Sequence, residues 1–196
     1  MSSLPAPVSR RPVHTRNIRF EGFLREDDLW DIDCELSDTK ADAIHMRERG
    51  MLPPGEPVHL LRVRLTVDDG FTIRAVQTAA VNAPFGECQS AANEPMQKLV
   101  GLTMGPGWRK KIDGAIGGVA GCTHLRELVF NAATAAFQMI PHHRALQRGH
   151  KDDSATADGK PPFYMGQCMT WAFDGPVVQR LAPHFYRASG TVKKAG

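Results

Sequence analysis

The sequence has little of what marks several large classes of protein. No apolar run approaches the roughly 20 residues that a membrane-spanning helix needs. The opening segment, MSSLPAPVSRRPVHTR, lacks the apolar stretch of a secretory signal. The 24 basic and 21 acidic residues are interspersed, whereas nucleic-acid-binding proteins gather Lys and Arg on one face. We therefore expect a cytoplasmic protein that binds neither membranes nor nucleic acid.

Cysteine is also scarce, and its spacing is informative. The four cysteines are Cys34, Cys88, Cys122 and Cys168. None of them forms a C-x-x-C pair, which argues against a zinc ribbon, and a reducing compartment argues against disulfides. The sequence shows no internal repeat, and its GAIGG segment does not follow a strand as a dinucleotide-binding loop should. A Rossmann architecture is therefore disfavoured.

The length and composition fit one folded domain. At 196 residues with 42% hydrophobic and 23% charged residues, the chain can bury a core without metals or disulfides. We divide it into a flexible lead over 1–13, a single domain over 14–146, a mobile linker over 147–162 and a C-terminal strand and helix extension over 163–196. The linker assignment rests on the near absence of apolar residues in QRGHKDDSATADGKPP.

The first half of the domain has the pattern of antiparallel strands. Residues 15–24 and 29–38 alternate apolar and polar side chains, and the second segment does so more strictly. Residues 58–67 and 71–78 flank Asp-Asp-Gly, which predicts a hairpin with a positive φ at its glycine, Gly70.

The second half has the pattern of helices. Pro95 suits the first turn of a helix that ends near Gly101, and the GPGW turn starts another that runs to about Ile116. From Cys122 onward apolar residues recur every three or four positions, which predicts a long helix that ends before Pro141. Strands followed by helices predict an α+β fold, an antiparallel sheet with helices packed on one face.

Two cysteines stand where a thiol could react. Cys122 opens the long helix within GGVAGCTHLREL, and a helix N-terminus favours the thiolate through its free N–H groups and dipole. Cys88 lies in another glycine-containing loop that leads into a helix. Both could face one pocket as substrate-binding groups, or both could simply pack as small apolar side chains.

Several polar residues are candidates for catalysis. Asp38 falls in phase with the buried face of its strand, and His59 lies at the end of the apolar face of the next long strand, so either could be a general base. His124 is a third candidate. Alternatively, Asp38 caps a turn and His59 is a core histidine whose hydrogen bonds are satisfied.

Cations and aromatic residues complete the predicted site. Lys40 and Arg126 are candidate partners for an anionic oxygen of a substrate. Trp30 and Trp108 are candidate walls of a pocket for an aromatic ligand, although each also suits the protein core.

The combination of LWDIDCELSDTK, PPGEPVH, VRLTVDDGFTIRA, LVGLTMGPGW and GGVAGCTHLREL resembles an uncharacterised bacterial family of unknown function over residues 14 to about 140. The resemblance associates the chain with the breakdown of lignin-derived aromatic dimers. It implies lyases that need no cofactor and release formaldehyde from a hydroxymethyl side chain.

Residues 55–140 also resemble, in architecture, the U-type iron-sulfur scaffold proteins. Cys88 and Cys122 match two of the three scaffold cysteines, whereas PPGEPVH has no cysteine where the first belongs and offers only Glu56 and His59. His124 follows its cysteine, whereas the scaffold pattern places a histidine before it.

Two functions from different classes follow from these patterns. The first is a cofactor-free lyase on a phenolic substrate, with Asp38, His59 or His124 as the base. The second is a protein that binds zinc or an iron-sulfur cluster through Cys88, Cys122 and His124, which suit such ions as mixed ligands. An exposed edge strand would favour a homodimer.

Overall fold

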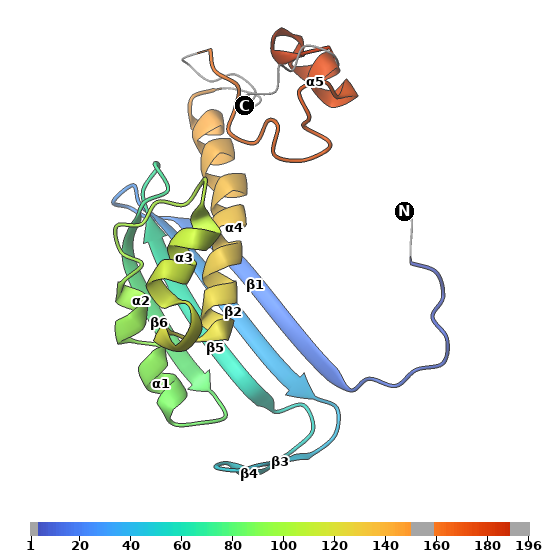
Figure 1. Cartoon of the computed structure of the whole chain (residues 1–196), viewed down its shortest axis with the longest axis vertical. Coiled ribbons are helices and arrows are strands. Elements are labelled where there is room, and N and C mark those ends of the chain that lie inside the picture. Colours follow the sequence, from blue (N-terminus) through green and yellow to red (C-terminus); the bar gives the residue numbers. More distant parts are fainter. Residues whose placement is uncertain (1–3, 150–158, 189–196) are drawn as a thin grey trace. The chain divides into compact units, whose positions relative to one another are not determined.

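Four antiparallel strands form the sheet that carries the site in the computed structural model, which describes residues 4–149 and 159–188. They are β1 (His14–Leu24), β2 (Trp30–Lys40), β5 (Pro57–Val67) and β6 (Ile73–Asn82), in the spatial order β1-β2-β5-β6 (Figure 1). In β2, Trp30 and every second residue after it, as far as Asp38, are buried. The residues between them are half-buried. The predicted strands and their pairing as a sheet are confirmed.

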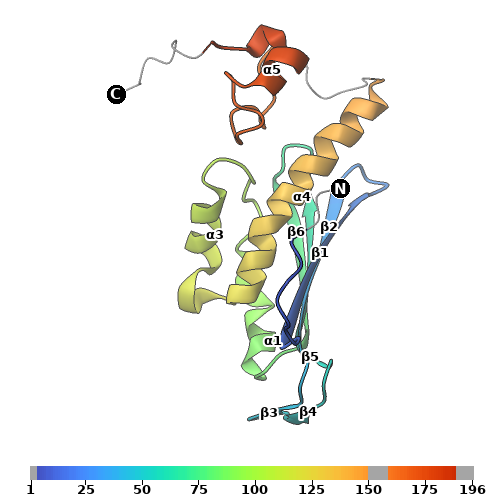
Figure 2. The same ribbon diagram turned by 90° about the vertical axis from the view of Figure 1, so that its right-hand side faces the viewer.

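Helices cover one face of this sheet, as Figure 2 shows edge-on. The short helices α1 (Glu87–Ala91) and α2 (Glu94–Gln97) precede α3 (Trp108–Ile116) and the long α4 (Thr123–Gln147). The apolar positions of α4 that the spacing predicts are buried, among them Leu125, Leu128 and Val129 at 0% exposure. The α+β fold class is therefore confirmed.

Gly22 allows the closest approach between α4 and the sheet. A Cβ at Gly22 would collide with Sδ of Met139, which projects from α4 over this point of β1. The glycine thus leaves room for a side chain of the helix rather than interrupting the strand, because β1 pairs continuously with β2 from His14 to Leu24.

Three local predictions were wrong. Helix α4 continues through Pro141 to Gln147, so His142 and His143 lie within the helix. A proline removes one hydrogen bond from the helix, and here the helix continues in spite of that loss.

The second error concerns the hairpin turn. Its positive φ falls on Phe71, at 63°, and not on Gly70. Asp68 holds the turn in this form, because its carbonyl accepts the Phe71 N–H and its carboxylate accepts the Thr72 N–H.

The third error is an omission. A small hairpin of β3 (Ile44–Met46) and β4 (Gly50–Leu52) lies between β2 and β5. Strands of three residues are too short to show a periodic pattern in the sequence.

The chain divides into two units, Met1–Ile140 and Pro141–Gly196, so the division falls inside α4. In the second unit, residues 159–188 hold α5 (Pro176–Leu181) and a short 3-10 turn (Pro183–Phe185), and the strand expected over 163–196 does not form among them. The predicted linker over 147–162 falls mostly on 150–158, outside the described residues. No helix among the described residues is long and apolar enough to cross a membrane.

We predict that the helix–sheet interface supplies much of the stability of the first unit. Leu128→Ala should lower the free energy of unfolding by about 2–5 kcal/mol, because the side chain is fully buried and its loss leaves a cavity. Chemical denaturation followed by circular dichroism measures this change. The control Gln138→Ala, at an exposed position of α4, should change stability by less than about 0.5 kcal/mol. Equal losses in the two variants would contradict the assigned buried face.

Candidate functional site

A buried carboxylate, Asp38, organises the site. It lies near the end of β2, in phase with the apolar side chains of that strand, and is only 2% exposed. Arg16 on β1 lies opposite it in the strand register and donates from Nε to Oδ1 at 2.8 Å and from Nη2 to Oδ2 at 2.9 Å. This bidentate pair is the charge-assisted arrangement that a buried carboxylate needs.

Two histidines complete the surroundings of Asp38. His59 on β5 is its register partner on the other side, with Nδ1 3.1 Å from Oδ2. His14, at the start of β1, has Nε2 3.2 Å from Oδ1. Four nitrogen atoms therefore lie within 3.2 Å of the two carboxylate oxygens, and three of them, two of Arg16 and one of His59, make hydrogen bonds to Asp38.

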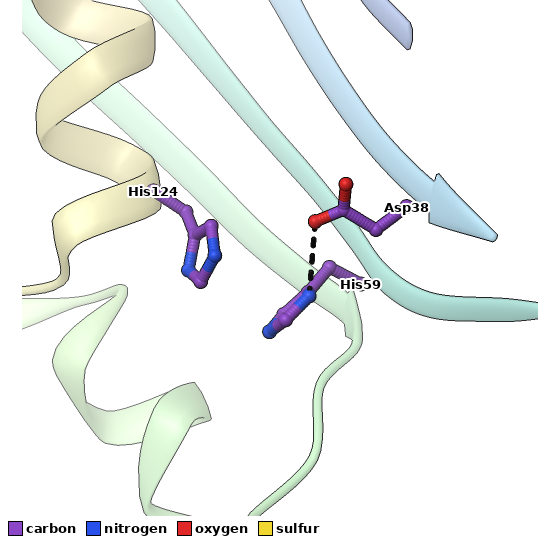
Figure 3. Close-up of side chains that lie close together, drawn as sticks. All are labelled: Asp38, His59 and His124. Carbon is purple, nitrogen blue, oxygen red and sulfur yellow. Dashed lines mark hydrogen bonds and ion pairs between the residues drawn. The ribbon is translucent and has the colours of Figure 1, made fainter. Parts of the chain in front are cut away.

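The start of α4 brings two more groups to the same end of the sheet. The His124 ring lies beside the His59 ring, with 4.1 Å between the ring centroids (Figure 3). Sγ of Cys122, the residue before α4, lies 3.8 Å from Nδ1 of His124. Arg16 also reaches α4, where its Nη1 donates to Glu127 Oε2 at 3.1 Å. One network thus links β1, β2, β5 and α4.

The surroundings shift the pKa values of the two neighbouring histidines in opposite directions. Burial, followed by the nearby charge of His124, lowers the pKa of His59 despite the opposing effect of Asp38. The hydrogen bond to Cys122 raises the pKa of His124 against the effect of burial. His59 is therefore the more easily deprotonated of the two rings, and His124 the more easily protonated.

The surroundings lower the pKa values of the two acidic partners, Asp38 and Cys122, and so favour their ionised forms. Burial alone would raise the pKa of Asp38, but the hydrogen bond and charge of Arg16, followed by the charges of His59 and His14, lower it overall. Burial also opposes ionisation of Cys122, yet the hydrogen bond from His124 and those from the backbone N–H groups of Leu125 and His124 lower its pKa. An ionised Asp38 can only accept, so Nδ1 of His59 carries the proton and its Nε2 has a free lone pair.

This arrangement has the parts of an acid–base site. His59 is oriented by a carboxylate and neutral, so Nε2 can take a proton or bind a metal ion. The protonated His124 can stabilise a negative charge that develops nearby. Among the described residues, one group of three possible metal ligands occurs, Asp38, His59 and His124, with one ligand atom of each within 4.8 Å of the others.

The other predicted site residues lie apart from this group. Arg126 pairs with Asp113 of α3 at 3.0 Å and lines a groove of about 330 Å³ on the outer side of α3 and α4. Lys40, half-buried, is the last residue of β2, and no contact joins its side chain to Asp38 in the structure as described. Cys88 is half-buried in α1 and is absent from the group of possible metal ligands just defined for the described chain. Glu56 is exposed in the turn before β5.

The two tryptophans do not wall the site. Trp30 begins β2, eight residues before Asp38 and so about 26 Å away at about 3.3 Å per residue, and its Nε1 donates to Asp69. Trp108, the first residue of α3, is 5% exposed within the core. The alternation placed Trp30 on the correct face of the strand but not at the end where the polar groups meet.

Three residues of the network were missed in the sequence: His14, Arg16 and Glu127. Their signal was present, since Arg16 and His14 share the face of β1 that carries Ile18 and Phe20. A cation on the apolar face of a strand needs a carboxylate on a neighbouring strand, and Asp38 was the candidate in phase.

Comparison with known proteins gives the family of the chain. The family model described as a protein of unknown function, DUF2889, matches residues 14–138, so the chain belongs to that family. The match covers the sheet and α4 up to the point just before Met139, and it includes every residue of the Asp38 network. No curated protein and no solved structure matches the chain. The resemblance to iron-sulfur scaffold proteins stays a prediction.

We predict that the Asp38 network stabilises the fold in a pH-dependent way. Asp38→Asn should cost about 1–3 kcal/mol at pH 7, because Arg16 loses its ionic partner and the amide cannot accept every hydrogen bond. The folded-state pKa of Asp38 lies below 3.8, so its ionised form stabilises the fold above that pH. The difference between the variant and wild type should shrink as the pH falls below 3.8.

Urea denaturation at several pH values measures this dependence. Asp27→Asn is the control, because Asp27 also pairs with an arginine, Arg25, but is exposed to solvent. It should change stability little at any pH. A loss in Asp38→Asn that stays constant down to pH 3 would show that folding does not lower the pKa of Asp38.

Proposed function

We propose that this protein is an enzyme that acts on a small molecule and that His59 is its general base. The observation that carries the proposal is the contact between the buried, ionised Asp38 and Nδ1 of His59. The carboxylate fixes both the orientation and the tautomer of the ring, which leaves Nε2 free to accept a proton. The Asp38 partner and the lowered pKa of His59 support the role, since a base must be unprotonated near neutral pH.

The other two candidate bases are less suited. Asp38 is held by two hydrogen bonds from Arg16 and has a lowered pKa, which makes it a poor proton acceptor. His124 has a raised pKa and a thiol partner in Cys122, so it suits the role of a cation. We therefore assign His59 to proton transfer, His124 to stabilising an oxyanion, and Asp38 and Arg16 to positioning His59.

The proposed reaction is the release of formaldehyde from a phenolic substrate with a hydroxymethyl side chain. The substrate first loses a benzylic hydroxyl group together with its phenolic proton as water, which gives a quinone methide. His59 then takes the proton of the hydroxymethyl group, the oxygen forms the C=O bond of formaldehyde, and the adjacent carbon–carbon bond breaks. Its electron pair enters the quinone methide, which becomes a phenolate beside the protonated His124. The substrate class rests on the family resemblance, and the acid–base pair rests on the geometry.

We propose a cytoplasmic location, which the four free thiols support.

We predict that His59→Ala lowers kcat by about 10²- to 10⁴-fold, the usual contribution of a general base. Formaldehyde release from a phenolic hydroxymethyl dimer measures turnover, and the melting temperature reports folding. His45→Ala, at an exposed histidine of β3, is the control and should keep full activity. Full activity in folded His59→Ala would remove His59 from the mechanism. No formaldehyde from the wild-type protein would refute the proposed substrate class.

The dependence of kcat/KM on pH should show the ionisation of the base. Because the pKa of His59 is lowered below 6.5, activity should rise with pH, with the midpoint of the rise below pH 6.5. A rise centred above pH 6.5 would contradict the assignment of His59 as a base that is neutral at physiological pH.

Metal binding is a second candidate function, favoured by the grouping of ligand atoms. Asp38, His59 and His124 each offer one ligand atom within 4.8 Å of the others, so we propose these three as the ligands, in place of the set with Cys88 and Cys122. Two imidazoles and a carboxylate form a ligand set that zinc takes in proteins, with a fourth position left open. A set without a thiolate favours zinc over an iron-sulfur cluster.

Metal analysis of untagged protein separates the two candidates. The zinc site predicts about one zinc ion per chain, lost in His124→Ala and retained in His45→Ala, at an exposed histidine of β3. The general base predicts activity that survives removal of metal by a chelator. Stoichiometric zinc that is essential for activity would replace the first candidate, because the lone pair of His59 would then bind the ion.

A further inference from the structure

The two edge strands of the sheet differ in how regularly they pair with their inner neighbours. Strand β6 forms one edge, and its pairing with β5 shifts register twice, between Leu60 and Leu61 and between Thr66 and Val67. Such bulges are a common protection of sheet edges. Strand β1 forms the other edge, pairs with β2 over eleven residues without a shift, and contains neither proline nor lysine. No strand of the described chain pairs with its outer side (Figure 1).

The side chains of β1 leave apolar surface open at this edge. Ile18, which points to the face covered by α4, is 42% exposed, and Leu24 on the same face is 37% exposed. Gly22 lies between them and has no side chain, so Met139 of α4 covers its backbone. A second strand laid along β1 would cover this surface and the unpaired backbone groups together.

We propose that β1 pairs in antiparallel fashion with β1 of a second copy of this chain, around a twofold axis at Phe20. The register brings residues 16–24 of each chain together. Arg19 then lies opposite Glu21 of the partner chain, and Glu21 opposite the partner's Arg19. Ile18 lies opposite the partner's Gly22, beside the Met139 that fills the space over that glycine.

Charge selects this register among its neighbours. Directly opposed residues of antiparallel strands point to the same face, so a twofold arrangement must centre on a residue. A centre at Arg19 would oppose two arginines, and a centre at Glu21 would oppose two glutamates. The centre at Phe20 instead forms two attractive pairs between the chains. Arg19 and Glu21 are well exposed, at 63% and 47%, and lie 3.5 Å apart as an ion pair within each chain, so the dimer joins two such pairs into one cluster of alternating charge.

The dimer goes beyond the proposed function, and its test does not depend on catalysis. Sedimentation equilibrium of the full chain should show a dimer. In a dimer of Arg19→Glu, a glutamate faces a glutamate at both pairs, and in a dimer of Glu21→Arg an arginine faces an arginine. Each variant alone should therefore raise the dissociation constant of the dimer by about tenfold or more. Mixed in equal amounts, the two variants should form a heterodimer, because every opposed pair is then attractive.

The mixing experiment also controls for misfolding, since a variant that regains pairing with its complement is folded. Arg62→Glu, a charge reversal on the same face of the inner strand β5, should leave the dimer intact. A monomeric wild-type protein overturns the proposal. Single variants that dimerise like wild type, or mixed variants that do not associate, overturn the register.

Discussion

The ion pair between Arg16 and Asp38 is the contact on which the rest of the site depends. A carboxylate that is 2% exposed is costly to bury unless its charge is compensated, and two bonds from one guanidinium supply that compensation. Asp38 then also accepts a hydrogen bond from His59, and Nε2 of His14 lies 3.2 Å from its Oδ1. The same guanidinium reaches Glu127, so the pair also fixes the start of α4 against the sheet. Orientation of His59 and placement of His124 thus have one physical origin.

The pKa values of His59 and His124 are shifted in opposite directions because the two rings have different neighbours. His59 faces a carboxylate that already has an arginine as its partner, so the attraction of Asp38 is too weak to offset burial and the charge of His124. His124 faces a thiol whose ionisation is favoured by backbone N–H groups at the beginning of a long helix. Two imidazoles whose ring centroids lie 4.1 Å apart thus have pKa values shifted in opposite directions, as the proposed acid–base pair requires. Acid–base pairs are commonly built by setting the pKa values of neighbouring groups apart in this way.

The sequence predicted the α+β fold, because each long element has a pattern of its own. The alternation of β2 and β5 placed Asp38 and His59 on buried faces, and the spacing in α4 placed its buried stripe correctly. Arg16 was missed because its role appears only when the register of β1 with β2 is known, and their contact joins residues 22 positions apart. Trp30 was misplaced because alternation gives the face of a strand but not the end at which partners gather. Likewise, no local pattern showed that His124 would meet His59.

The central claim is that Asp38 holds His59 as a neutral imidazole with its proton on Nδ1, beside a protonated His124. Nitrogen-15 chemical shifts of the imidazole rings, followed through a pH titration by NMR, test it directly. Our account predicts that His59 keeps its proton on Nδ1 and titrates below pH 6.5, while His124 titrates above pH 6.5. A His59 with its proton on Nε2, or one that titrates above His124, would contradict it.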